Sequence, residues 1–432
     1  MVSWPVAALV IIVCVLGSNM PTALYGVLRG EIGFSAATQT AIFGAYMVGV
    51  LPGLLVVGPL SDRLGRRPIL MVALIVTFMA SAGFLFADSV LTLVVIRLLQ
   101  GLSVGAATVA GVACIFATMS AHRVALAALL AAAATAVGAA LGPPVGGLVA
   151  ELFGRSVIAP YVLELGLVAV TAGFLLFAPS PRSAPTSTRD VAAADPAGEP
   201  RSSMTMTCLL AGLSWVVVGL FQAVGPALLS ESLGITHLGV LGLAVALVMT
   251  ASTITSMLAR RWPAARLRGA GLVLLVIGCA ALALTLTTGS AVIAGAAAIA
   301  IGIAHGLVFL GATRDLNVLS AARRTGTSVL ATGVFYTSAY LGSAAPTLGV
   351  GLLADSVGLT RAALVLLAVV AALAALLGAR EALRWWAFRP NRDDPAQPGG
   401  LTPRGDTNPR RASKQGGSAE AVESSAGRVM AR

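Results

Sequence analysis

Charged side chains are scarce in this chain. Asp, Glu, Lys and Arg together make up 10% of its 432 residues, and histidine occurs only three times. A soluble globular domain carries about a quarter charged residues. Here 57% of the residues are apolar and the mean hydropathy is +0.93. Lipid is therefore the expected surroundings of most of the chain.

Motifs for metals, disulfides and nucleotides are also missing. The four cysteines lie in apolar runs, with no C-x-x-C pair and no histidine nearby, at Cys14, Cys114, Cys208 and Cys279. We therefore expect small buried packing residues, with no metal site and no cofactor. No P-loop, H-E-x-x-H or dinucleotide fingerprint occurs. The chain is accordingly not expected to be an enzyme, and an ion gradient or the substrate's own gradient would supply its energy.

The sequence contains twelve apolar runs that can cross a membrane as helices. A membrane-spanning helix needs about 20 predominantly apolar residues. The interval 269–313 has no Asp, Glu, Lys or Arg, and Thr287 to Ser290 marks a turn that divides it into two runs. The runs lie at about 5–28, 37–60, 69–87, 90–117, 125–150, 157–178, 207–229, 238–259, 269–287, 291–312, 328–353 and 361–380.

The two halves of the chain resemble each other. G-L-V-A-E-L-F-G at 147–154 recurs as G-L-L-A-D-S-V-G at 351–358. A stretch rich in Pro, Ser, Ala and Thr separates the halves, which is typical of a linker. We therefore predict an all-α transmembrane fold, with twelve helices in two pseudo-symmetric six-helix bundles around a central cavity. The predicted parts are an N-terminal bundle at 1–178, a cytoplasmic linker at 179–206, a C-terminal bundle at 207–380 and a disordered cytoplasmic tail at 381–432.

The distribution of arginine predicts the orientation in the membrane. With the N-terminus inside, fourteen arginines fall in the inside loops and three in the outside loops. Positive residues near the ends of spans favour the cytoplasmic side. We therefore expect a multi-pass protein of the cell inner (plasma) membrane with both termini in the cytoplasm. This also accounts for the net charge of +11, so no nucleic-acid partner is expected.

Four charges interrupt the apolar sequence between the second and third runs, in G-P-L-S-D-R-L-G-R-R-P at 58–68. An arginine can bind a carboxylate or the carbonyl groups at a helix C-terminus, and an aspartate suits a helix N-terminus. Such a loop can act as a conformational latch that holds one bundle to the other and releases it. The alternative is that its arginines only set the topology. The predicted latch residues are Gly58, Asp62, Arg63, Gly65, Arg66 and Arg67.

Three motifs carry a resemblance to a known family. The loop at 58–68 resembles the loop signature of the major facilitator superfamily, and Arg97-x-x-Gln100-Gly101 resembles its fourth-helix motif. The fifth-helix motif of the drug/proton antiporter branches is similar to the pattern formed by Gly138, Gly142, Pro143, Gly146 and Gly147. The resemblance implies a rocking-bundle secondary transporter. The fifth-helix motif favours proton-coupled export of small organic molecules such as drugs or sugars.

Other interpretations of these motifs stay open. Gly138, Gly142 and Gly146 are spaced by four, so they also form a small-residue packing face, and Pro143 permits a kink. The first run has no acid before Glu31, so the acidic first-helix proton site of some drug exporters is missing. An uptake permease or a facilitator of the same fold is therefore the alternative.

Three ionisable side chains fall inside predicted spans. A charge at mid-bilayer costs about 2.5–3.5 kcal/mol, so it usually has a partner or a function. Arg97 and Glu164 lie at matching depths and can form an ion pair or handle protons. His305, with an ordinary pKa near 6.5, can exchange a proton or can simply be packed and hydrogen-bonded. The proton-coupling candidates are therefore Arg97, Glu164 and His305.

Polar and aromatic residues inside the spans are candidates for the cavity wall, namely Asn19, Tyr25, Gln100, Gln222, Tyr336 and Tyr340. Gly101-Leu102-Ser103-Val104-Gly105 fits the G-x-S-x-G pattern, which with His305 raises the alternative of an intramembrane serine hydrolase. That pattern needs a strand–turn–helix, and here it lies in the middle of a run. The expected partners are a small-molecule substrate, protons and membrane lipid, and the expected state is a monomer.

Overall fold

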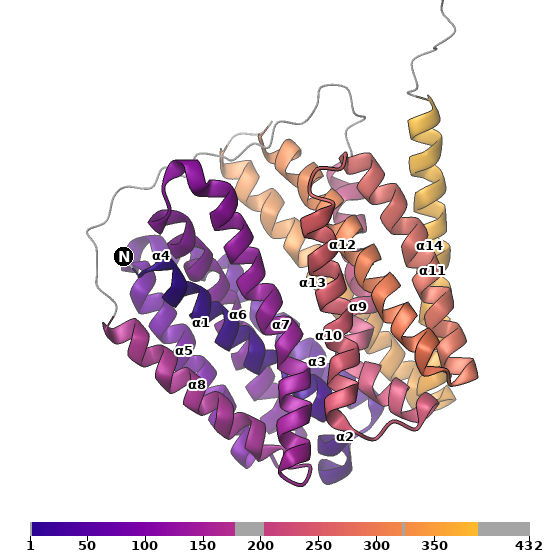
Figure 1. Cartoon of the computed structure of the whole chain (residues 1–432), viewed down its shortest axis with the longest axis horizontal. Helices are drawn as coiled ribbons and strands as arrows, with labels where there is room; N and C mark the ends of the chain where they lie inside the picture. The colour runs from indigo at the N-terminus through magenta and orange to yellow at the C-terminus, as the bar shows by residue number, and fades with distance from the viewer. Residues whose placement is uncertain (1, 178–202, 322–324, 388–432) are drawn as a thin grey trace, which may run out of the picture. The chain divides into compact units, whose positions relative to one another are not determined.

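The computed structural model describes residues 2–177, 203–321 and 325–387. These residues form α-helices and two short 3-10 helices, and no strand occurs among them (Figure 1). The first half contains α1 (Trp4–Asn19), α2 (Pro21–Ile32), α3 (Ala36–Leu55), α4 (Val57–Leu64), α5 (Arg66–Gly83), η1 (Phe84–Phe86), α6 (Val90–Thr118), η2 (Ala121–Arg123), α7 (Val124–Leu152) and α8 (Ile158–Phe177). The second half contains α9 (Met204–Leu233), α10 (Leu238–Leu258), α11 (Ala264–Thr288), α12 (Ala291–Ala321), α13 (Thr325–Val357) and α14 (Leu359–Ala387).

The predicted apolar runs coincide with these helices. Within the described part of the chain, eleven spans are long and apolar enough to cross a membrane. The remaining predicted run, 328–353, corresponds to α13, which is less apolar because hydroxyl side chains crowd residues 336–343. Helix α14 continues to Ala387, which lies within the predicted tail at 381–432. The predicted linker up to residue 202 and the tail beyond 387 lie outside the described residues.

Proline and glycine set the breaks between neighbouring helices. Pro21 begins α2 directly after α1, and the Met20 N–H still donates to the Leu16 carbonyl at 3.1 Å. The two helices therefore form one bent span, since proline removes only its own N–H donor. Between α4 and α5 the chain turns at Gly65, whose φ is +91°. Residues with a side chain rarely adopt this conformation, which explains the glycine in the loop motif.

The glycine motif of α7 brings this helix against both halves. A Cβ atom at Gly138 or Gly142 would come within 2.7 or 2.5 Å of a backbone oxygen of α1, and one at Gly146 within 2.9 Å of the carbonyl oxygen of Met20, which directly follows α1. Such distances are too short for a side chain, so the two helices touch along their backbones. The neighbouring residues Pro143 and Gly147 lie against the backbone of α10 in the second half.

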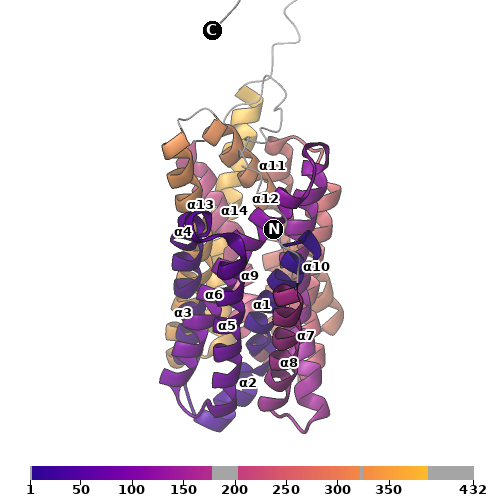
Figure 2. The same ribbon diagram turned by 90° about the vertical axis from the view of Figure 1, so that its left-hand side faces the viewer.

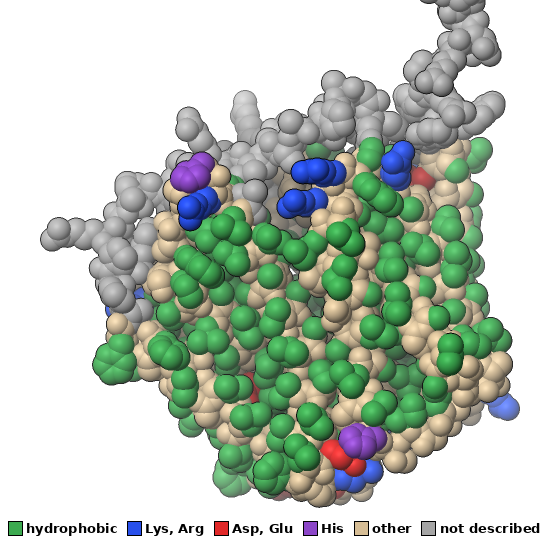
Figure 3. Space-filling model, viewed as in Figure 1, with side chains coloured by type: hydrophobic (Ala, Val, Ile, Leu, Met, Phe, Trp, Pro, Cys, Tyr) green, Lys and Arg blue, Asp and Glu red, His purple; other side chains and the backbone are tan. Residues whose placement is uncertain are grey.

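The two halves meet through two helix pairs. Figure 2 shows α3 beside α13 and α7 beside α10, the largest contacts between the halves. In Figure 3, apolar side chains cover the middle of the surface and Lys and Arg side chains gather along its upper edge. This is the surface of a membrane-spanning protein.

The two ends of the molecule are named here by their helices. Helices α5, α7 and α11 begin at one end, which we call the arginine-rich end. Helices α3, α8 and α10 begin at the other, which we call the opposite end.

Candidate functional site

A cavity of about 750 Å³ lies between the two halves. Its size is that of a site for a drug-sized ligand. Helices α1, α3, α5, α6 and α7 line it from the first half, and α9, α12 and α13 line it from the second. The cavity extends from Asn19, at the end of α1, to Arg66, at the start of α5. It therefore reaches the arginine-rich end of the molecule.

The two halves supply different walls to this cavity. The first half contributes mostly aliphatic and small side chains, among them Val104, Val112 and Ala136. The second half contributes Gln222, Ala339 and an aromatic cluster. We call this cluster, which consists of Trp215, His305, Phe309, Tyr336 and Tyr340, the aromatic wall.

Ring contacts between three helices hold the aromatic wall together. Trp215 of α9 meets His305 of α12 edge-on, with ring centroids 5.0 Å apart, and Phe309 in the same way at 5.9 Å. Phe309 also stacks on His305 at 5.6 Å. Tyr340 of α13 lies 6.3 Å from Trp215. His305 is held further by the hydroxyl oxygen of Ser252, which lies 2.7 Å from its Nδ1.

Most of the residues predicted for the cavity do line it. They are Asn19, Gln222, Tyr336 and Tyr340, together with the proton-coupling candidate His305. The prediction is wrong for Tyr25 and Gln100, whose side chains are 2% and 1% exposed inside the first half and do not line the cavity. The sequence analysis missed Tyr46, Trp215 and Phe309, because aromatic residues are ordinary in membrane spans.

Amide side chains join the halves at the closed end of the cavity. Gln222 of α9 donates through Nε2 to Oδ1 of Asn19 in α1 at 3.1 Å, and Asn19 donates to the Val15 carbonyl at 2.8 Å. Gln39 of α3 donates to the Ala223 carbonyl of α9 at 2.7 Å. These bonds cross from one half to the other, so any opening of this end must break them.

Two acids close the opposite end of the molecule. Glu151 of α7 accepts a hydrogen bond from the N–H of Leu238, the first residue of α10, at 3.0 Å. Asp355 of α13 accepts from the N–H groups of Ala36 and Ala37 at the start of α3, at 3.1 and 3.4 Å. A carboxylate at a helix N-terminus is stabilising. Both acids belong to the repeated motif at 147–154 and 351–358, although the repeat alone did not predict these contacts between the halves.

The arginines of the loop motif contact the first half itself. Arg66 donates to the Ala113 carbonyl of α6 at 2.9 Å, and Arg67 donates to the Leu176 carbonyl of α8 at 2.6 Å. These carbonyls lie near helix C-termini, where the sequence analysis expected arginine to bind. The surroundings of Gly58 and of the Asp62 side chain lie outside the described part of the structure, so the latch stays a prediction.

Arg97 is buried in α6 and surrounded by neutral groups. Its guanidinium donates to the Ser18 carbonyl at 2.6 Å and to Oε1 of Gln100 at 2.7 Å, and it lies 4.7 Å from the centroid of the Tyr46 ring. Gln100 in turn donates to the Gly17 carbonyl at 3.2 Å. The side chain of Arg97 is 2% exposed. Backbone oxygens of α1 thus stabilise this charge where an acid was expected.

Glu164 of α8 is fully buried and forms no ion pair with Arg97, so the predicted pair is wrong. Its carboxyl group lies against α1 at Gly17, in the space that any side chain at this position would fill. Neither carboxyl oxygen has a hydrogen-bond partner within the described residues. The neighbouring hydroxyl of Ser81 donates its proton to the Thr77 carbonyl at 2.9 Å. Although α1 carries no acid of its own, α8 supplies one to its surface.

The geometry contradicts the serine hydrolase. Ser103 is 1% exposed in the middle of α6 and donates to the Gln100 carbonyl at 2.9 Å. His305 belongs to the other half and is paired with Ser252. The G-x-S-x-G glycines instead allow close helix contact, since a Cβ atom at Gly105 would come within 2.6 Å of a carbonyl oxygen of α3.

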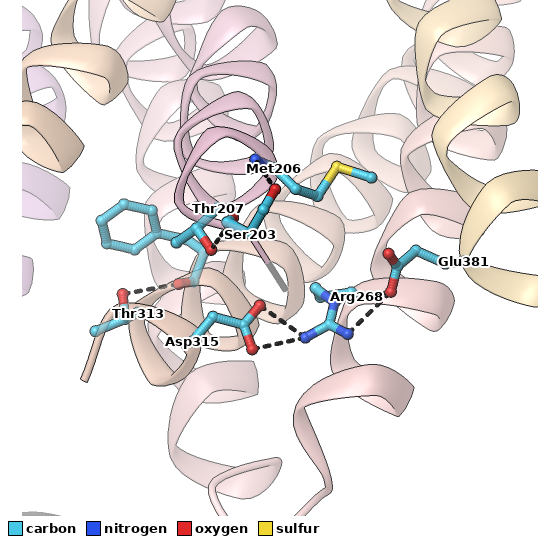
Figure 4. Close-up of polar contacts among 8 residues, drawn as sticks. Ser203, Met206, Thr207, Arg268, Thr313, Asp315 and Glu381 are labelled. Atoms are coloured by element: carbon cyan, nitrogen blue, oxygen red, sulfur yellow. Dashed lines mark hydrogen bonds and ion pairs between the residues drawn. The ribbon is translucent and has the colours of Figure 1, made fainter. Parts of the chain in front are cut away.

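A second buried arginine, Arg268 of α11, forms a charged cluster that the sequence analysis missed. It binds both oxygens of Asp315 at 2.7 and 2.8 Å and Oε2 of Glu381 at 2.9 Å. Figure 4 shows these three side chains, from α11, α12 and α14, near the start of α9. There the Ser203 hydroxyl caps the helix by accepting from the Met206 N–H at 3.3 Å. The ion pair also explains why α14 stays helical beyond residue 380.

The chain is similar to drug-resistance proteins and to transporters of small molecules. The chain is 31% identical to a chloramphenicol resistance protein of Pseudomonas aeruginosa over 39% of its own length and 40% of the relative's. It is 28% identical to the multidrug resistance protein MdtL of Salmonella dublin, over 53% of this chain and 58% of the relative. A D-xylose transporter of Levilactobacillus brevis is 33% identical over 19% of this chain and 18% of the relative. The chain thus matches at most about three fifths of these relatives' lengths.

Solved structures share the fold over a larger part of the chain. A bacterial homolog of the human lysosomal transporter Spinster, in an inward-facing and occupied conformation, has a TM-score of 0.68 and 15% identity. The match covers 90% of this chain and 98% of that one. The nucleoside transporter NupG has a TM-score of 0.66 and 11% identity, covering 87% and 98%. The predicted twelve-helix fold is confirmed. The sequence profile of the Major Facilitator Superfamily matches residues 7–345, and the chain therefore belongs to this family of transporters.

Proposed function

We propose that the protein is a proton-coupled exporter of small organic molecules, working as a monomer in the cell inner membrane by alternating access. The arginine-rich end lies in the cytoplasm in this proposal, as the loop charges predict. Substrate enters the central cavity from that side and leaves after the halves rock. The relatives that confer chloramphenicol and multidrug resistance support the direction.

The central cavity is the observation that carries this proposal. It reaches the arginine-rich end at Arg66. The opposite end is held closed by the hydrogen bonds that Glu151, Asp355 and the side-chain amide of Asn19 accept from the other half. A chain with this arrangement can release substrate on the other side only if these contacts break. Alternating access provides that second state. A ligand or proton that binds the two states with different affinities shifts the equilibrium between them.

Glu164 is the coupling acid of the proposed cycle. Its carboxyl group is buried without a cationic partner among the described residues, and an isolated carboxylate there would be costly. It therefore carries its proton in this conformation and loses it when the helices around Gly17 move. Arg97, bound to neighbouring backbone of α1, stabilises the deprotonated carboxylate after that movement. His305 is the second candidate, because it lines the cavity.

Uptake is the alternative direction. The D-xylose transporter and a gallate transporter of Pseudomonas putida are also similar to this chain. Purified protein in proteoliposomes distinguishes the directions, with chloramphenicol as the first probe and the resistance protein as a positive control. With the arginine-rich face outside the vesicle and the lumen one pH unit more acidic, an exporter that exchanges one proton accumulates the probe about tenfold. An uptake system would instead accumulate it when the lumen is the more alkaline side, and a facilitator would only equilibrate it.

A further inference from the structure

The aromatic wall gives the cavity a preference for flat rings. Five of its lining side chains from the second half are aromatic. The ring centroids of four of them, Trp215, His305, Phe309 and Tyr340, lie 5.0–6.3 Å from a neighbour in the wall. The Tyr336 side chain is 39% exposed, so part of this wall is free to contact a ligand. Stacked and edge-on ring pairs strengthen binding beyond the contribution of the apolar area that they bury. An aliphatic molecule of equal size gains the binding energy of the buried apolar area, but not the additional contribution of ring contacts.

Aliphatic side chains on the facing wall limit the ligand's polarity. Besides Tyr46 and Phe116, the first half lines the cavity mostly with aliphatic side chains such as Val109 and Ala132. Its lining threonines are Thr108 and Thr135. A ligand with many hydroxyl groups would leave several of them without partners, and each unpaired buried hydroxyl weakens binding. Because Asn19, Gln222 and the tyrosine hydroxyls are the main polar groups, the cavity suits a ligand with one or two polar substituents.

The charge of the lining opposes cations. Among the described residues that line the cavity, Arg66 is the one with a permanent charge. An ammonium group entering this space would lose its hydration and meet no carboxylate among the described lining residues. Cation–π contacts with the ring faces return only part of that cost. An anionic group can instead turn toward the Arg66 guanidinium at the cytoplasmic mouth.

These observations, resting on the proposed transport role of the cavity, together name a substrate class. The geometry points to a flat aromatic molecule with one or two polar groups, uncharged or anionic, whose rings lie on the aromatic wall. Trp215 and Tyr340 determine the preference for rings, and Arg66 determines the preference for an anion over a cation. Cationic aromatic compounds and polyhydroxylated sugars are disfavoured by the same lining.

Matched bicyclic probes test this class by equilibrium dialysis against the purified full chain in detergent. 2-Naphthamide, 2-naphthoate and 2-naphthylmethylammonium share a ring system and differ in charge, while decalin-2-carboxamide has a similar shape without aromaticity. We expect the amide and the carboxylate to bind at least tenfold more tightly than the ammonium compound. We also expect 2-naphthamide to bind at least fivefold more tightly than the decalin compound.

Two variants assign these preferences to residues. Tyr340→Leu should reduce the naphthamide preference over decalin-2-carboxamide to about twofold, whereas Trp262→Leu, at a half-exposed site outside the cavity, should leave it unchanged. Arg66→Gln should weaken 2-naphthoate about tenfold and leave 2-naphthamide unchanged. Binding of decalin-2-carboxamide checks that each variant still forms the cavity.

Three results would overturn the assignment. They are ammonium binding as tight as amide binding, equal affinity for the aromatic and saturated amides, and no binding of any probe by the wild type. The experiment measures binding without a gradient, so it is separate from the transport assay. If the probes bind as expected but no gradient drives chloramphenicol or 2-naphthamide into vesicles, the proposed export is rejected and the assignment of the cavity stands.

Discussion

The structure buries an arginine in each half and surrounds the two in opposite ways. Arg268 lies between the carboxylates of Asp315 and Glu381, and these three charges join α11, α12 and α14. Arg97 contacts carbonyl oxygens and the Tyr46 ring, while the buried Glu164 stays apart from it. A carboxylate that is paired with an arginine has little tendency to take up a proton. A buried acid without a cationic partner can take up or release a proton, so we infer that the charged cluster of the second half is structural and that Glu164 in the first half carries the coupling.

The largest expected effect comes from breaking the cluster of the second half. Arg268→Met removes the guanidinium that binds the buried carboxylates of Asp315 and Glu381, and removing one partner of a buried pair costs about 3–5 kcal/mol. We therefore expect a strong loss of thermal stability in detergent. Arg266→Met is the matched control, because this neighbouring arginine is exposed, and it should change stability by no more than about 0.5 kcal/mol. Equal effects of the two changes would show that the cluster is not structural.

The next effect sharpens the comparison at Gly17. A methyl group there would overlap the Glu164 carboxyl group, so Gly17→Ala must displace the acid at a cost of about 1–3 kcal/mol. We expect lower stability together with a loss of accumulation driven by the pH gradient. Gly26→Ala adds the same methyl group at a site with open space and serves as the control. If Gly17→Ala accumulates substrate as the control does, the position of Glu164 beside α1 has no role in coupling.

A third prediction separates charges that stabilise one half from charges that join the two halves. Glu151→Ala and Asp355→Ala each remove a helix cap, worth about 1 kcal/mol. Together they should favour the state that is open at the opposite end. A cysteine at Thr40, buried between α3 and α13 at that end, should then react about tenfold faster with a maleimide. The control is Glu31→Ala, which removes an exposed acid of the first half. It should leave the rate of the maleimide reaction unchanged.

The smallest expected effect is the coupling energy between Arg97 and Glu164. An ion pair would make the double change Arg97→Met with Glu164→Gln much less harmful than the sum of the single changes. The structure has no such pair, so we expect a coupling energy below about 1 kcal/mol in a thermal-unfolding cycle. A coupling of about 3 kcal/mol would mean that the two side chains meet in the dominant state.

The sequence predicted the helices well because membrane spans need long apolar runs and little else. It also predicted most polar residues of the cavity, since Asn19, Gln222 and His305 have few other reasons to lie in a span. It could not separate these residues from Tyr25 and Gln100. In a helix that is apolar on every side, no hydrophobic face shows which direction a polar side chain takes.

Contacts between distant helices could not be predicted from spacing. Asp315 and Glu381 stand 66 positions apart, and each looked like an ordinary charge at the end of a span. Matching depth suggested a pair for Arg97 and Glu164, but depth fixes only one of three coordinates. Arg97 instead donates to the backbone carbonyl of Ser18 in α1, a partner that no sequence motif encodes.

Proton release on substrate binding tests the central claim most directly. Purified wild-type protein in weakly buffered detergent solution receives a saturating amount of the chosen substrate, and a pH indicator counts the protons released. The account predicts close to one proton per protein for the wild type, none for Glu164→Gln, and an unchanged count for Glu31→Gln. Release of the same proton by Glu164→Gln would contradict the assignment of coupling to the first half. If that release also required His305, the coupling group would be the histidine in the cavity.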